Sequence, residues 1–277
     1  MKSIHKSMLG ALVAVAAFAT SAKADLTAAQ GDLLLSFYTV NGASVGANAY
    51  TINLGRASNL IGSTGALLGN INTDLEVAFG AGWQNNTQLT MNLITGYSST
   101  ATPSAPDAAR TIYAGAAISN ISAAGTSTPQ KAVSTSQART WATQVSGFVD
   151  QQNGRAANGA VAPNAAIIAT STAGDVTDYN PPISAGTYFG VGNNPTTTFT
   201  SGNIGTLGGN TFEAAMDLWK ADYASPTLPA PSYVTTIGIT STGDLYTTVP
   251  EPSTYALLAL AAAGLGAHIV RRRQKQS

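Results

Sequence analysis

The sequence predicts an α+β domain with a mainly antiparallel β-sheet and about three flanking helices. Segments with strand-like alternation tend to come in consecutive pairs, whereas helical periodicity occurs in a few separate segments. The connecting stretches are rich in glycine, asparagine and threonine. This order is more typical of an antiparallel sheet than of a parallel α/β fold. A β-sandwich with decorating helices is the alternative.

The first two elements are predicted strands joined by a hairpin loop. Residues 33–40 form an apolar run of strand length, which favours a buried strand. Tyr50, Ile52 and Leu54 alternate with polar residues and predict a half-buried strand. Residues 42–48 would form the loop between them.

A short helix and two more strands follow. Thr73 and Glu76 have the spacing of a capping box that opens a helix, and Gly80 suits its end. Further strands are predicted at residues 89–93 and 111–117, with a loop at 98–106 between them.

The middle of the chain contains the clearest helical pattern. Ser134 and Gln137 resemble a helix start, and Gly154 provides a stop. The helix should pack on the sheet through one continuous apolar stripe: Ala138, Trp141, Ala142, Val145, Phe148 and Val149.

The last third begins with a loop-rich region and short strands at 166–170, 187–191 and 196–200. Asn210 and Glu213 then suggest the start of a third helix, which Pro226 would end. Strands at 233–240 and 244–249 follow, with a turn at 241–243. The apolar face of the third helix would be Phe212, Ala215, Met216, Trp219 and Tyr223.

The N-terminus has the three parts of a secretory signal peptide, residues 1–24. Lys2 and Lys6 precede an apolar stretch, and Ala22 and Ala24 form a small-x-small cleavage site. We therefore expect the Sec translocon and signal peptidase as partners and a mature chain that begins at Asp25.

The C-terminus has the composition of a membrane anchor. Residues 253–270 carry no Asp, Glu, Lys or Arg and would reach about 27 Å as a helix, close to the thickness of a bilayer core. We place the transmembrane helix at 255–270. Residues 271–277 form a basic tail, in which Arg271, Arg272 and Arg273 would hold this end in the cytoplasm.

The residues before this anchor, 249–254, complete a specific pattern. Val249, Pro250, Glu251 and Pro252 lead into the apolar span and the arginine cluster. All three parts, in this order, resemble the PEP-CTERM sorting signal of Gram-negative bacteria. The resemblance implies an exosortase, a membrane-embedded cysteine protease, as partner. It also implies a transient inner-membrane anchor with the domain in the periplasm, release to the cell surface or medium, and an association with exopolysaccharide and biofilm.

The domain between these signals, residues 25–248, excludes several activities by composition. The chain has no cysteine, and its two histidines, His5 and His268, lie in the signal peptide and the anchor. A Ser-His-Asp triad, a Cys-His pair and the usual zinc or haem ligands are therefore excluded, and we expect no cofactor. Twelve acidic and six basic residues give a net charge of −6, which argues against nucleic-acid binding.

These observations favour a non-enzymatic protein of the cell surface or extracellular matrix. The alternatives are a polysaccharide hydrolase with a carboxylate pair, for which no catalytic residue stands out, and a carbohydrate-binding module. Trp83 follows a glycine-rich stretch and is the best candidate for an exposed aromatic platform. Asp175 and Asp178 are expected to be turn residues rather than calcium ligands. Glu213 and Asp217 are expected on a solvated helix face.

Overall fold

The computed structural model describes residues 25–41, 44–127, 135–171, 196–198, 204–223 and 230–248. The signal peptide with Ala22 and Ala24, and the whole segment from Val249 through Arg271, Arg272 and Arg273 to the end, lie outside these ranges. So do Ser134, the predicted strand at 187–191, and Asp175 with Asp178. The predictions made for these residues are not tested by the structure.

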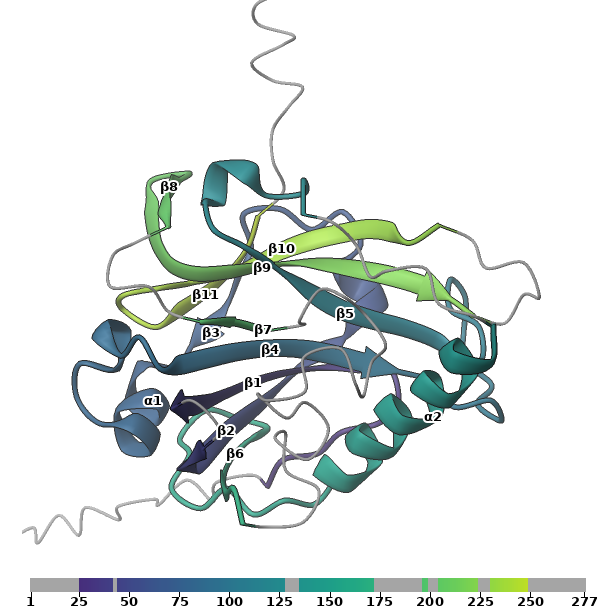
Figure 1. Cartoon of the computed structure of the whole chain (residues 1–277), viewed down its shortest axis with the longest axis horizontal. Helices are drawn as coiled ribbons and strands as arrows, with labels where there is room; N and C mark the ends of the chain where they lie inside the picture. The colour runs from purple at the N-terminus through teal and green to yellow at the C-terminus, as the bar shows by residue number, and fades with distance from the viewer. Residues whose placement is uncertain are drawn as a thin grey trace, which may run out of the picture.

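One curled, antiparallel sheet organises the described residues (Figure 1). Its strands run in the order β3-β11-β10-β9-β5-β4-β1-β2-β6, with β7 paired to β4 and β8 paired to β9. The strands are β1 (Asp32–Asn41), β2 (Ser44–Arg56), β3 (Leu67–Asn70), β4 (Leu89–Gly96), β5 (Thr111–Ile118), β6 (Ala165–Ala169), β7 (Thr196–Thr198), β8 (Gly205–Leu207), β9 (Asn210–Asp222), β10 (Ser232–Thr240) and β11 (Asp244–Thr248).

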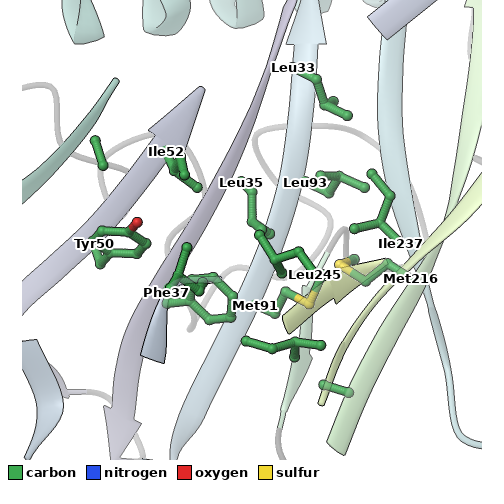
Figure 2. Close-up of a cluster of buried hydrophobic side chains, with 14 of the residues drawn as sticks. Leu33, Leu35, Phe37, Tyr50, Ile52, Met91, Leu93, Met216, Ile237 and Leu245 are labelled. Carbon is green, nitrogen blue, oxygen red and sulfur yellow. The ribbon is translucent and has the colours of Figure 1, made fainter. Parts of the chain in front are cut away.

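The largest apolar core lies on one face of this sheet. Figure 2 shows side chains from β1, β2, β4, β9, β10 and β11 pointing toward one another, among them Leu35, Met91 and Met216. Helix α1 (Asn72–Phe79) contributes Leu75 to the same core. Because neighbouring residues of a strand point to opposite faces, the intervening residues must pack elsewhere.

Helix α2 (Thr135–Gln152) covers part of the other face (Figure 1). Trp141, Val145 and Phe148 pack against Leu34 of β1 and Ile112 of β5 in a second buried cluster. Both faces of the central strands are therefore buried, and every residue of β4 is buried.

Most predicted elements are confirmed. Strands β1, β4, β5, β6, β10 and β11 and helix α2 lie where the sequence placed them, within a few residues. Strand β2 also forms, but it begins at Ser44, which pairs with Asn41 of β1, so the hairpin loop predicted at residues 42–48 is wrong from residue 44 onward. Helix α1 also forms and ends before Gly80, but its predicted capping box is absent. The residue before the helix is Ile71, with no side-chain cap, and the Glu76 carboxylate instead accepts a hydrogen bond from the Asn72 amide.

The prediction of a third helix that starts at Asn210 is wrong. Residues 210–222 form strand β9, which pairs with β5 along one edge and with β10 along the other. The described residues therefore contain two α-helices instead of about three, and one sheet rather than the two of a sandwich. Asp217 is correspondingly not solvated: it is fully buried in the sheet.

Two buried aspartates fasten loops to this sheet. The Asp217 carboxylate accepts hydrogen bonds from the backbone N–H groups of Gly125 and Ser127, at 2.8 and 3.0 Å, and from the Thr236 hydroxyl of β10. Asp74 of α1 similarly accepts from the Tyr50 hydroxyl at 2.9 Å and from the backbone of residues 161–162. In a chain without cysteine, such contacts take the place of crosslinks.

Replacing Asp217 with alanine should lower the free energy of unfolding by about 3 kcal/mol, because two buried N–H groups and a hydroxyl lose their acceptor. Urea denaturation of the domain, residues 25–248, would measure this change. Asp150→Ala is the matched control: its carboxylate is exposed and accepts from Gln30, so its effect should stay within about 0.5 kcal/mol. Equal effects of the two substitutions would contradict the fastening role of Asp217.

Candidate functional site

An open cleft of about 400 Å³ lies where the end of β2 meets the loop after β4. The 3-10 turn η1 (Ala57–Leu60) forms one side and the loop at 101–105 forms the other. The lining is mostly hydroxyl, amide and small side chains, with one charged group, Arg56. The lining residues are Gln30, Arg56, Ser58, Asn59, Tyr97, Ala101, Thr102, Pro103, Ser104 and Ala105.

Arg56 is held in a fixed position in this cleft. Its Nη1 donates to the Gln30 carbonyl at 2.6 Å and to the Tyr97 hydroxyl at 2.9 Å, and its Nε lies 3.4 Å from the Asp32 carboxylate. The side chain is nonetheless 45% exposed. A guanidinium fixed in this way offers its remaining N–H groups to a ligand at a small cost in side-chain entropy.

Tyr97 connects the cleft to a buried polar network. Its hydroxyl donates to Asp107 at 3.2 Å, and the Tyr113 hydroxyl donates to the other oxygen of the same carboxylate. Burial, reinforced by Asp107, raises the pKa of both tyrosines. Both hydroxyls therefore keep their protons at neutral pH and act as hydrogen-bond donors.

Lys220 of β9 supplies the counter-charge beneath the cleft. Its ammonium lies 3.1 Å from Asp107 and 3.8 Å from Asp222, and donates to the Pro106 carbonyl at 2.7 Å. These contacts tie the loop after β4 to the sheet. Charges from two separate parts of the chain, the loop after β4 and strand β9, thus hold the loop that forms one side of the cleft.

This arrangement does not resemble the site of a glycoside hydrolase. Such an enzyme brings two carboxylates to opposite sides of a sugar bond, but the cleft lining contains none. Asp107 and Asp222 do lie on either side of the same lysine, yet the Asp107 side chain is 1% exposed and its oxygens are occupied. Among the described residues, no cluster of three His, Cys, Asp or Glu side chains could hold a metal ion.

The predicted aromatic platform is also absent at Trp83. This residue is 1% exposed and belongs to the main core, and its indole N–H donates to the Asn72 side chain at 3.0 Å. Trp141 lies on α2 and is buried between this helix and the sheet, as expected for a core residue. Trp219 is half-buried on β9, edge-to-face with Tyr233.

The sequence did not single out the cleft residues. Gln30, Arg56 and Tyr97 are far apart along the chain, and none belongs to a recognisable motif. The only signal was that Arg56 is one of six basic residues in an acidic domain. Within the described part of the chain, no helix is long and apolar enough to cross a membrane.

Comparison with known proteins identifies the C-terminal segment. Residues 248–273 match the PEP-CTERM protein-sorting motif. This match includes Val249, Pro250, Glu251 and Pro252 as well as Arg271, Arg272 and Arg273. It begins at the last residue of β11. No curated protein and no solved structure shows significant similarity to the chain.

The domain should lose stability as the pH rises above 10. Burial raises the pKa of Tyr223 and Tyr233 to about 12, and that of Tyr97 and Tyr113 also lies above its ordinary value. Between the unfolded and folded pKa values, only the unfolded chain releases these protons, so alkali favours unfolding. Melting temperatures measured from pH 8 to 11.5 should fall, and Tyr233→Phe should make this fall shallower. A flat profile above pH 10 would contradict these shifts.

Proposed function

We propose that this exosortase substrate is a non-enzymatic protein of the cell surface or the extracellular matrix, associated with exopolysaccharide. The PEP-CTERM motif marks it as sorted through an exosortase. The observation that carries the non-enzymatic part is the cleft, whose lining has a fixed arginine but no carboxylate. The absence of histidine and cysteine from residues 25–248 supports the same conclusion.

In this proposal the two ends of the chain direct its transport. The signal peptide takes the chain through the Sec translocon and is removed after Ala24. Residues 255–270 then hold the domain at the outer side of the inner membrane, and Arg271, Arg272 and Arg273 stop translocation. An exosortase next cuts near Pro250-Glu251-Pro252 and releases the domain from its anchor.

The sorting motif should be needed for processing but not for folding. Replacing Pro250, Glu251 and Pro252 together with alanine should trap the full-length chain in the inner membrane, because alanine lets the span's helix extend toward the domain. Immunoblots of membrane and medium fractions, with one epitope in the domain and one after Ser277, would follow both ends. The domain's melting temperature should not change.

Wild-type protein that stays full length on mature cell surfaces would contradict removal of the anchor. If the wild type is cut and the alanine variant is cut equally well, the motif acts only as a spacer and the tail only as an anchor.

Carbohydrate binding is the second candidate, and one observation favours it. The walls of the cleft carry hydroxyl and amide groups, and the Arg56 guanidinium, held in place by its hydrogen bonds, is among the lining groups. Sugars are bound through such hydrogen bonds, and a guanidinium also accommodates an acidic sugar. A polymer surrounding the cell would then be the natural ligand.

Exopolysaccharide prepared from the producing cells should bind the secreted domain, and Arg56→Ala should weaken this binding about tenfold. Isothermal titration calorimetry would measure the affinity, and a reducing-end assay on the same mixture should show no cleavage. Arg139→Ala changes the net charge equally at an exposed position on α2 and serves as the control. Release of reducing ends would favour the hydrolase alternative.

A further inference from the structure

Residues 61–67, the loop that leads into β3 together with the first residue of that strand, lie beside the C-terminal part of β11. The Gly65 N–H donates to the Thr247 carbonyl at 2.7 Å, and the Thr247 N–H donates to the Ala66 carbonyl at 2.9 Å. We call this segment the 61–67 loop. Its backbone is therefore fixed next to Thr248, the last residue of the domain that the structure describes.

The 61–67 loop exposes two large apolar side chains. Ile61 is 47% exposed and Leu67 is 58% exposed. Six of the seven residues of the loop are exposed, which makes it a projecting surface of the domain. Because single exposed apolar residues are common on proteins, their exposure alone assigns no partner.

The surface around this loop carries almost no charge. Residues 57–73 and 230–248, which include β3, β10 and β11, contain one charged residue, Asp244. Asp244 pairs with Asn70, at the opposite end of β11 from Thr248. The rest of the domain holds the other eleven acidic residues and all six basic ones. An uncharged surface can approach a bilayer without desolvating ions and without repulsion from anionic lipids.

The length of the chain after Thr248 limits which part of the domain can meet the membrane. The proposed membrane span begins at residue 255, only seven residues later. Whatever their conformation, these residues reach at most about 25 Å, whereas a compact domain of this length is roughly 45 Å across. The far side of the domain therefore cannot reach the bilayer, but the 61–67 loop can.

We propose that the 61–67 loop contacts the phospholipid surface of the membrane while the domain is still anchored, with Ile61 and Leu67 among the lipid headgroups. The inference rests on the proposed anchor at 255–270 and adds an orientation of the domain to it. Two half-exposed side chains fall well short of the roughly 800 Å² that each partner buries in a stable protein dimer. They suffice for a lipid contact because the short tether keeps the loop at a high effective concentration near the bilayer. Cleavage by the exosortase removes the tether, and the contact is then lost.

The chain contains no cysteine, so one introduced cysteine can carry a fluorophore as a reporter. Thr64 is exposed within the loop and leaves both apolar side chains in place. Full-length protein with a labelled Thr64→Cys, reconstituted in phospholipid vesicles with nitroxide-labelled headgroups, should be strongly quenched. Val77→Cys is the spatial control: Val77 is 55% exposed on α1, which begins beside Gly243, beyond the Asp244 end of β11. Its label should show little quenching.

A second comparison separates lipid contact from mere proximity to the anchor. In the Thr64-labelled chain, Ile61→Ser together with Leu67→Ser should lower the ratio of quenched to unquenched label about tenfold, because the apolar area that enters the headgroup region is lost. Val161→Ser is the matched control, since Val161 is 56% exposed but lies beside Asp74 of α1, and it should leave the ratio unchanged. The melting temperatures of these variants should equal that of the parent.

The outcomes distinguish this inference from the proposed function. Full-length chains that do not float with the vesicles would contradict the anchor itself. Chains that float but show equal quenching at positions 64 and 77, or no effect of the two serine substitutions, would overturn the lipid contact. Self-quenching of the Thr64 label that rises with the protein-to-lipid ratio, without nitroxide quenching, would also overturn it, because the loop would then bind a second copy of the chain.

Discussion

The sheet depends on the pairing of β9 with two strands at once. β9 bonds β5 along one edge and β10 along the other, and so joins β3, β11 and β10 to the rest of the sheet. Its residues also reach both faces: Met216 enters the main core, whereas Asp217 fastens the loop at 125–127. Without β9, each half of the sheet would expose an apolar face and an unpaired edge.

The sequence pattern predicted a helix where β9 forms, and the reason is physical. β9 is buried on both faces, so apolar residues replace the usual alternation, and Phe212, Ala215, Met216 and Trp219 happen to match a helical stripe. Strands β1 and β2 were predicted because their alternation or strand-length apolar runs stand out, and α2 because its stripe extends over three turns. β3 was missed because four residues, two of them Leu67 and Leu68, carry no periodic signal.

The cleft could not be predicted from the sequence, because its residues are far apart along the chain and only the folded sheet brings them together. Arg56 ends β2, Tyr97 follows β4, and Lys220 lies on β9, so sequence spacing contains no trace of their contacts. Composition showed only that the domain carries twelve acidic and six basic residues and no histidine or cysteine. The structure shows where those charges lie, with Asp107 and Lys220 buried beneath a single fixed guanidinium at the surface.

The position of β11 connects folding to sorting. Among the described strands, β3 pairs with β11 alone, so in the proposed pathway that edge of the sheet forms only after the whole domain has left the translocon. In the proposed pathway the membrane span follows within a few residues and stops translocation at that moment. Because this pairing joins residues about 175 positions apart, it closes a long loop and forms slowly. An anchor that keeps the chain at the membrane therefore gives the last strand time to pair before the protease separates the domain from its tail.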